Sequence, residues 1–187
     1  MTIYVQQPIP GQNDQWTITA TYNGFGGIAY TTPEHQILDV GHTFVGFTKV
    51  NTDGTSVTQV MGFYPDAKGF LPGVKSHGII QDDSGHPYNV SYATNVTATQ
   101  FNAALGRVVT DNANANYILS NGQAPYPEYN CTDAALTWMS TASLQIPGNV
   151  ARGAFDNTPG DYGQALRSFN GANTAKSTAP SGHGACN

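Results

Sequence analysis

The sequence predicts a single α+β domain in which an antiparallel sheet comes first and helices follow. Two observations indicate this order. Up to about Ser91, short runs of alternating apolar and polar residues are separated by turn signals, which is the pattern of strands and hairpins. From about Thr97, apolar residues instead recur with the period of a helix. The length of 187 residues suits one domain with a core of its own.

The predicted strands of the first half end at turns rich in Gly and Asp. The clearest unit is a hairpin, because β-rich runs lie on both sides of Asn51-Thr52-Asp53-Gly54, and Asp-Gly favours a tight turn. Asp82-Asp83-Ser84-Gly85 is a second predicted turn. The runs expected to form strands are Gln15–Tyr22, Gly26–Tyr30, His42–Val50, Thr55–Tyr64, His77–Gln81 and Tyr88–Ala93.

Three helices are predicted in the second half. Thr97 and Gln100 have the spacing of a capping box ahead of a run with helical periodicity. Asn130 is a favourable N-cap, so the next residue opens a second helix. The expected helices run from the capping box at Thr97 to the Asn-rich stretch Asp111–Asn116, from Cys131 onward, and around Tyr162–Phe169. Residues 171–187 are rich in Gly, Ser, Ala and Pro, which predicts a loosely ordered tail after a domain of residues 1–170.

Charge and composition exclude several classes of partner. The chain has 7 basic and 12 acidic residues and a net charge of −5, so it lacks the basic surface that binds nucleic acid or anionic lipid. No stretch approaches the ~18 apolar residues of a membrane span, and no stable membrane insertion is expected. The first residues lack the basic start and apolar run of a secretory signal, so export would need a dedicated machine or a removed leader.

Cys131 and His42 are the residues whose positions favour catalysis. A cysteine that opens a helix lies among unpaired backbone N–H groups at the positive end of the helix dipole, which stabilises a thiolate. His42 begins a strand directly after Gly41, where the missing side chain allows close approach of another backbone. A buried structural cysteine and a solvated histidine are the alternatives for each residue taken singly.

Two segments carry a resemblance to a known family. Gly41-His42-Thr43-Phe44-Val45-Gly46-Phe47 and Tyr129-Asn130-Cys131-Thr132-Asp133-Ala134-Ala135-Leu136 resemble the His and Cys motifs of circularly permuted papain-like hydrolases of the NlpC type. Gly62-Phe63-Tyr64-Pro65 and Thr158-Pro159-Gly160-Asp161-Tyr162-Gly163 add weaker likenesses. The histidine precedes the cysteine here, which is the order of the permuted branch.

The resemblance implies a permuted papain-like fold with the nucleophile at the N-terminus of a helix packed on an antiparallel sheet. It implies Cys131 as nucleophile, His42 as base, and the backbone N–H of Cys131 as part of an oxyanion hole. A third group on the neighbouring strand would orient His42. Asp66 is the first candidate for that role, followed by Tyr64 and Asp39.

The expected function is a thiol hydrolase that cleaves an amide bond in peptidoglycan peptides. By analogy, the resemblance suggests an antibacterial effector exported by a system such as type VI secretion, acting in the target-cell periplasm and paired with an immunity protein. Two alternatives stay open. One is a lipid acyl hydrolase or acyltransferase of the lecithin:retinol acyltransferase-like type, and the other is a non-catalytic interaction domain on the same fold.

The remaining candidate residues give weaker signals. His77 and His86 flank Asp82 and Asp83, but their spacing matches no common zinc pattern, so no metal or other cofactor is expected. Tyr129, next to the Cys motif, is a candidate for lining a substrate cleft. Cys186 could form a disulfide with Cys131, but that bond would consume the nucleophile. We therefore expect a free Cys131 in the active form.

Overall fold

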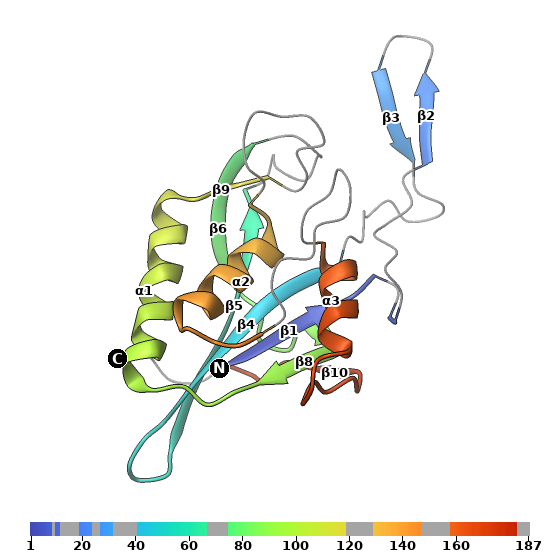
Figure 1. The fold of residues 1–187 in the computed structure, drawn as a ribbon. Helices are drawn as coiled ribbons and strands as arrows, with labels where there is room; N and C mark the ends of the chain where they lie inside the picture. Colours follow the sequence, from blue (N-terminus) through green and yellow to red (C-terminus); the bar gives the residue numbers. More distant parts are fainter. Residues whose placement is uncertain are drawn as a thin grey trace.

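A six-stranded antiparallel sheet is the main element of the structure (Figure 1). The computed structural model describes residues 1–8, 10–11, 19–23, 27–31, 41–66, 75–118, 129–146 and 158–182. The strand order is β8-β1-β4-β5-β6-β9, and every neighbouring pair is antiparallel. The bounds of these strands are β1 Thr2–Gln6, β4 His42–Val50, β5 Ser56–Pro65, β6 Ser76–Asp82, β8 Val90–Ala93 and β9 Asn116–Tyr117.

Three helices in the described part of the chain cover one face of this sheet (Figure 1). Helix α1 packs on β6, α2 on β4 and β5, and α3 on β1 and β8. The main hydrophobic core lies between the helices and the sheet and includes Phe47, Phe63 and Trp138. The helices are α1 Ala98–Asn114, α2 Cys131–Thr141 and α3 Pro159–Arg167.

The opposite face of the sheet carries a second, smaller cluster. Tyr4, Phe44 and Val60 are buried there together with Ala179. The cover is a short antiparallel pair, β7 (Pro87–Tyr88) with β10 (Ser177–Thr178). A separate hairpin, β2 (Thr19–Asn23) with β3 (Gly27–Thr31), makes up the second two-stranded pair.

The α+β class and its antiparallel sheet are confirmed, and so is the hairpin of β4 and β5. In that hairpin Val50 pairs with Ser56 and Phe44 with Gly62. Helix α1 begins at the predicted capping box, in which Thr97 accepts from the Gln100 backbone. Helix α3 begins earlier than predicted, because Thr158 caps it and a proline occupies its first turn.

The C-terminal segment differs from the predicted loose tail over residues 171–182. Asn173 bridges to Ser91, β10 pairs with β7, and Ala179 is buried against Phe44 and Val60. Backbone hydrogen bonds and the small side chains of Ala172 and Ala179 hold this segment, and neither leaves a periodic signal in the sequence. Residues 183–187, including Cys186, lie outside the described residues.

One buried carboxylate joins α1 to α2. Oδ2 of Asp111 accepts from the Tyr129 hydroxyl at 2.6 Å and from Nε1 of Trp138 at 2.7 Å. Its Oδ1 accepts from Nε of Arg107 at 2.9 Å. Tyr129 and Trp138 lie before and within α2, so Asp111 holds both ends of the segment that carries Cys131.

Replacing Asp111 with alanine should therefore lower the free energy of unfolding by about 3 kcal/mol, because the buried Trp138 and the half-buried Tyr129 lose their acceptor and Arg107 loses its charge partner. Chemical denaturation measures the change. Asn102→Ala, on the exposed side of the same helix, should stay within about 0.5 kcal/mol of the wild type. Equal stability of the two variants would contradict the proposed role of Asp111.

Candidate active site

The start of α2 is a fully capped helix terminus with Cys131 as its first residue. The Asn130 side chain accepts from the backbone N–H groups of Thr132 at 2.8 Å and Asp133 at 3.2 Å. The Asp133 carboxylate accepts in return from the Asn130 backbone at 3.0 Å. This reciprocal cap leaves the Cys131 side chain at the positive end of the helix.

The β4–β5 ladder opens where Cys131 lies. Its last registered pair is Phe44 with Gly62. Beyond it, the Thr43 backbone N–H bonds to the Cys131 sulfur, and the Thr43 hydroxyl lies 2.9 Å from that of Thr132. The N-terminus of α2 is thereby joined directly to the first residues of β4, the strand that carries His42.

Gly41 brings His42 to this position. Its φ of 74° lies in the left-handed region, and an added Cβ would overlap the Gln6 carbonyl oxygen and the ring of Pro8. The predicted close approach of another backbone at this glycine is therefore present, and β1 supplies it.

His42 binds both Cys131 and Asp83. Its Nε2 lies 2.9 Å from Oδ2 of Asp83, and its ring also makes a hydrogen bond with the Cys131 side chain. Because Asp83 occupies Nε2, Nδ1 is the nitrogen left for the sulfur. The Tyr64 hydroxyl donates to the other oxygen of Asp83 at 2.6 Å. His42, Asp83 and Cys131 are only 7%, 5% and 3% exposed, so the three groups interact with little screening by water.

The protonation states follow from these contacts. Burial alone would lower the pKa of His42, but hydrogen bonds to Asp83 and Cys131 and their charges raise it to about 9. Burial alone would raise the pKa of the Cys131 thiol, but His42, the Thr43 backbone N–H and the Thr132 side chain lower it below its usual value. At neutral pH the arrangement therefore favours a thiolate–imidazolium pair.

Tyr117, on β9, is a site residue that the sequence did not reveal. Its hydroxyl makes hydrogen bonds with the side chain and the backbone N–H of Cys131. Burial, followed by the nearby Cys131 charge, places the pKa of Tyr117 well above its usual value, so the phenol stays a donor. The position of Tyr117 depends on β9, a strand of two residues in which Tyr117 pairs with Ser76. A strand this short has no alternating pattern that the sequence could show.

The third residue of the constellation differs from the one predicted. The structure brings Cys131 and His42 together, but the carboxylate on the imidazole belongs to Asp83 and not to Asp66. Asp66 lies beyond the end of β5, where its backbone N–H bonds to His77. Tyr64, the second candidate, reaches Asp83 and not a ring nitrogen, and Asp39 lies outside the described residues.

The cause of this difference is Gly62. A Cβ at this position would overlap Oδ2 of Asp83 and crowd Nε2 of His42. Asp83 comes from the end of β6, the strand beyond β5, and it reaches β4 because Gly62 leaves the space open. The useful sequence signals are Gly62, which pairs near the start of β4, and Asp83, which the sequence places in a turn.

The other candidate residues have structural partners. Oδ1 of Asp82 accepts from the backbone and hydroxyl of Ser84, and His86 lies 2.9 Å from the Gln6 side chain. Within the described ranges, no three His, Cys, Asp or Glu side chains are arranged to hold a metal ion. Tyr129 packs edge-on against Phe63 and donates to Asp111, which makes it an anchor of the segment before α2.

Comparisons with known proteins add no relative. No protein-family model, curated protein or solved structure matches this chain, so the chemistry of the site is interpreted from its own geometry. None of the helices in the described part of the chain has the length and apolar composition needed to cross a membrane.

Gly62→Ala should disconnect Asp83 from His42, because the new methyl group occupies the space between β5 and the ion pair. For the thiol hydrolase expected from the sequence, kcat on an activated ester or amide substrate should fall about a hundredfold, because a misplacement of about 1 Å can cost that much. Gly106→Ala is the matched control, since nothing lies near an added Cβ there. A Gly62→Ala protein with wild-type kcat would contradict this account of the site.

The pH dependence of thiol reactivity tests the ion pair. Cys131 should react with iodoacetamide at pH values well below the usual pKa of a thiol, because His42 lowers the pKa of Cys131. His42→Gln should raise the pKa of Cys131 and so slow the reaction at neutral pH by about tenfold or more. Above the working pH, each unit by which the thiol pKa rises lowers the thiolate fraction about tenfold. For the thiol hydrolase expected from the sequence, kcat/KM should fall above about pH 9, where His42 loses the proton that the leaving group needs. Mass spectrometry of the peptide containing Cys131 measures the alkylation rate.

Proposed function

We propose that this protein is a cysteine hydrolase that cleaves an amide bond through an acyl-enzyme. The observation that supports the proposal most is the buried Cys131–His42–Asp83 constellation, in which a helix-terminal thiol with lowered pKa contacts an imidazole held by a carboxylate. A structural cysteine needs neither the imidazole nor the carboxylate. Burying two ionisable partners costs desolvation free energy, which favours a functional role for the pair over a purely structural one.

The chemistry begins with attack of the Cys131 thiolate on the carbonyl carbon of the substrate. The C–N bond then breaks, the His42 imidazolium gives its proton to the departing amine, and a thioester on Cys131 remains. Neutral His42 next takes a proton from a water molecule, which adds to the thioester carbonyl. The acid is released and the thiolate–imidazolium pair is restored. Asp83 keeps His42 oriented throughout, and Tyr64 holds Asp83 by its other oxygen.

The negative oxygen that forms on the substrate carbonyl needs donors close to the sulfur. The backbone N–H of Cys131 and the hydroxyl of Tyr117 both lie there. In the resting protein these two groups bind each other, so a substrate oxygen would replace Tyr117 as the acceptor of the N–H bond. Tyr117 could then turn its own hydrogen toward the same oxygen.

The permuted papain-like fold is part of this proposal. It is supported by the order of the two motifs, by a cysteine at the first position of a capped helix, and by a histidine at the first position of the strand beneath it. The resemblance to NlpC-type enzymes directs the choice of substrate to peptidoglycan peptides. We further propose an antibacterial effector that acts in the periplasm of a target cell.

Incubation with purified peptidoglycan should release peptides whose masses identify one cleaved amide bond. Cys131→Ala and His42→Ala should abolish the release, and Asp83→Asn should reduce it at least about tenfold, because the imidazole loses its orienting carboxylate. Asp66→Asn makes the same chemical change at the residue that the sequence favoured, and it should have a much smaller effect. A larger loss in Asp66→Asn than in Asp83→Asn would contradict the assignment of Asp83.

Expression in two compartments separates the substrate classes. With an added periplasmic leader, the wild type should cause rounding and lysis, and Cys131→Ala should not. Lysis with released fatty acid but intact wall peptides would favour the lipid alternative. Strong killing from the cytoplasm that depends on Cys131 would contradict the cell-wall proposal, and an inert Cys131 would favour an interaction domain.

A further inference from the structure

The turn that carries Asp83 follows the last residue of β6. The Asp83 backbone N–H bonds to the Val60 carbonyl at 3.0 Å, and the His86 N–H bonds back to the Asp83 carbonyl at 2.9 Å. Gly85 completes the turn with a φ of 77°. The position of the Asp83 carboxylate therefore depends on how this turn, residues 83–86, lies against the rest of the fold.

The C-terminal segment Ser177–Gly182, which we call the strap, binds the turn at Ser84, Gly85 and His86. The Gly85 N–H donates to the Ala179 carbonyl at 3.2 Å, and the Ala179 N–H donates to the His86 carbonyl at 2.9 Å. The Gly182 N–H donates to Oγ of Ser84 at 2.7 Å. Just after the turn, Thr178 pairs with Pro87 and Ser177 with Tyr88.

A buried side chain anchors the strap to the sheet. Ala179 is 4% exposed and lies in the small cluster with Tyr4, Phe44 and Val60. Phe44 in turn stacks on the His42 ring with centroids 5.4 Å apart. The strap thus contacts the turn that bears Asp83 and the ring that supports His42.

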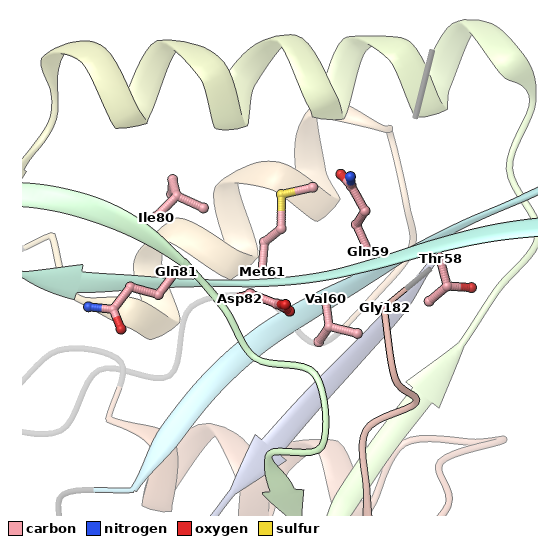
Figure 2. A pocket seen from close by; sticks show the side chains of 8 residues that line it. All are labelled: Thr58, Gln59, Val60, Met61, Ile80, Gln81, Asp82 and Gly182. Atoms are coloured by element: carbon pink, nitrogen blue, oxygen red, sulfur yellow. The ribbon is translucent and has the colours of Figure 1, made fainter. Parts of the chain in front are cut away.

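The far end of the strap borders a cavity and not the main core. Gly182 lines a pocket of about 430 Å³ beside Thr58, Val60 and Asp82, and Figure 2 shows the C-terminal chain reaching the edge of β5 there. The main core between the helices and the sheet does not include Ala179. Displacing the strap would therefore disturb the turn without opening the core.

We propose that the strap Ser177–Gly182 is a positioning element of the active site, which acts by holding the turn 83–86 so that Asp83 stays on His42. The inference rests on the proposed function, because it assigns a role to Asp83 in that chemistry. It also gives a use to a segment whose composition is typical of a dispensable tail. A partner that displaced the strap would weaken the His42–Asp83 contact from a distance.

An NMR titration of His42 in the full chain tests this proposal without any substrate. The titratable groups around His42 are Cys131, Asp83, Tyr64 and His86, and its pKa in the wild type is about 9. Asp83→Asn should lower the pKa of His42 by at least about one pH unit, a tenfold change in proton affinity. Ala179→Gln should shift it in the same direction, because the longer neutral side chain does not fit beside Phe44 and Val60.

Ala175→Gln is the matched control, since it makes the same change at an exposed position just before the strap. It should leave both the pKa of His42 and the catalytic rate unchanged. The double variant Asp83→Asn/Ala179→Gln should have the same His42 pKa as Asp83→Asn alone, because the strap acts through Asp83. A further fall in the double variant, or an unchanged pKa in a folded Ala179→Gln protein, would overturn the proposal.

A second pair of variants tests the same link from the side of the turn. Ser84 and Thr55 each bond an aspartate two residues earlier through both backbone and hydroxyl, but only Ser84 also accepts from the strap. Ser84→Ala should lower the pKa of His42 and slow turnover, and Thr55→Ala should do neither. Equal behaviour of the pair would count against the strap. An Asp83→Asn protein with wild-type pKa and rate would instead contradict the proposed catalytic role of Asp83.

Discussion

The site depends on the missing side chain of Gly62. A carboxylate at the end of β6 reaches an imidazole at the start of β4, although β5 lies between the two strands. An added methyl group on β5 would stand between Asp83 and His42. Glycine is costly within a strand because it gains nothing from packing and loses much backbone freedom, so its presence here has a steric reason.

Burial strengthens the electrostatic interactions within the site, and it also adds a desolvation cost for each charge. Three ionisable groups lie almost out of reach of water, two of them acidic. The second oxygen of Asp83 is satisfied by Tyr64, and the sulfur receives donors from Thr43 and Tyr117 in addition to His42. Each of these donors removes part of the desolvation cost that an unpaired charge would carry. Tyr64 and Tyr117 meet this need, since a phenol can donate a hydrogen bond from largely apolar surroundings.

Local signals were sufficient to predict that Cys131 opens a helix and that His42 opens a strand. Asn130 is a favourable N-cap and Gly41 permits a close approach before a strand, so both positions could be predicted from neighbouring residues. The pairing of Cys131 with His42 was predicted from the resemblance of the two motifs. Asp83 and Tyr117 could not be predicted in this way, because each depends on which strand lies beside which. The same holds for Ala179, whose burial requires a surface made by Tyr4, Phe44 and Val60 from three different strands. The sequence did not reveal the residues whose position depends on a contact with a part of the chain far away in the sequence.

Strand β1 has partners that are synthesised long after it. Gln7, just after β1, bonds through its side chain to Gly160 and Arg167, and β1 itself lies between β4 and β8 under α3. During synthesis the chain leaves the ribosome from its N-terminus, so β1 must wait for these later segments before it is fully enclosed. Such distant pairings also slow folding, because each closes a long loop before it gains a contact. When Cys131 is synthesised, α3 does not yet exist, so β1 still lacks the helix that covers it, and Gln7 still lacks Gly160 and Arg167.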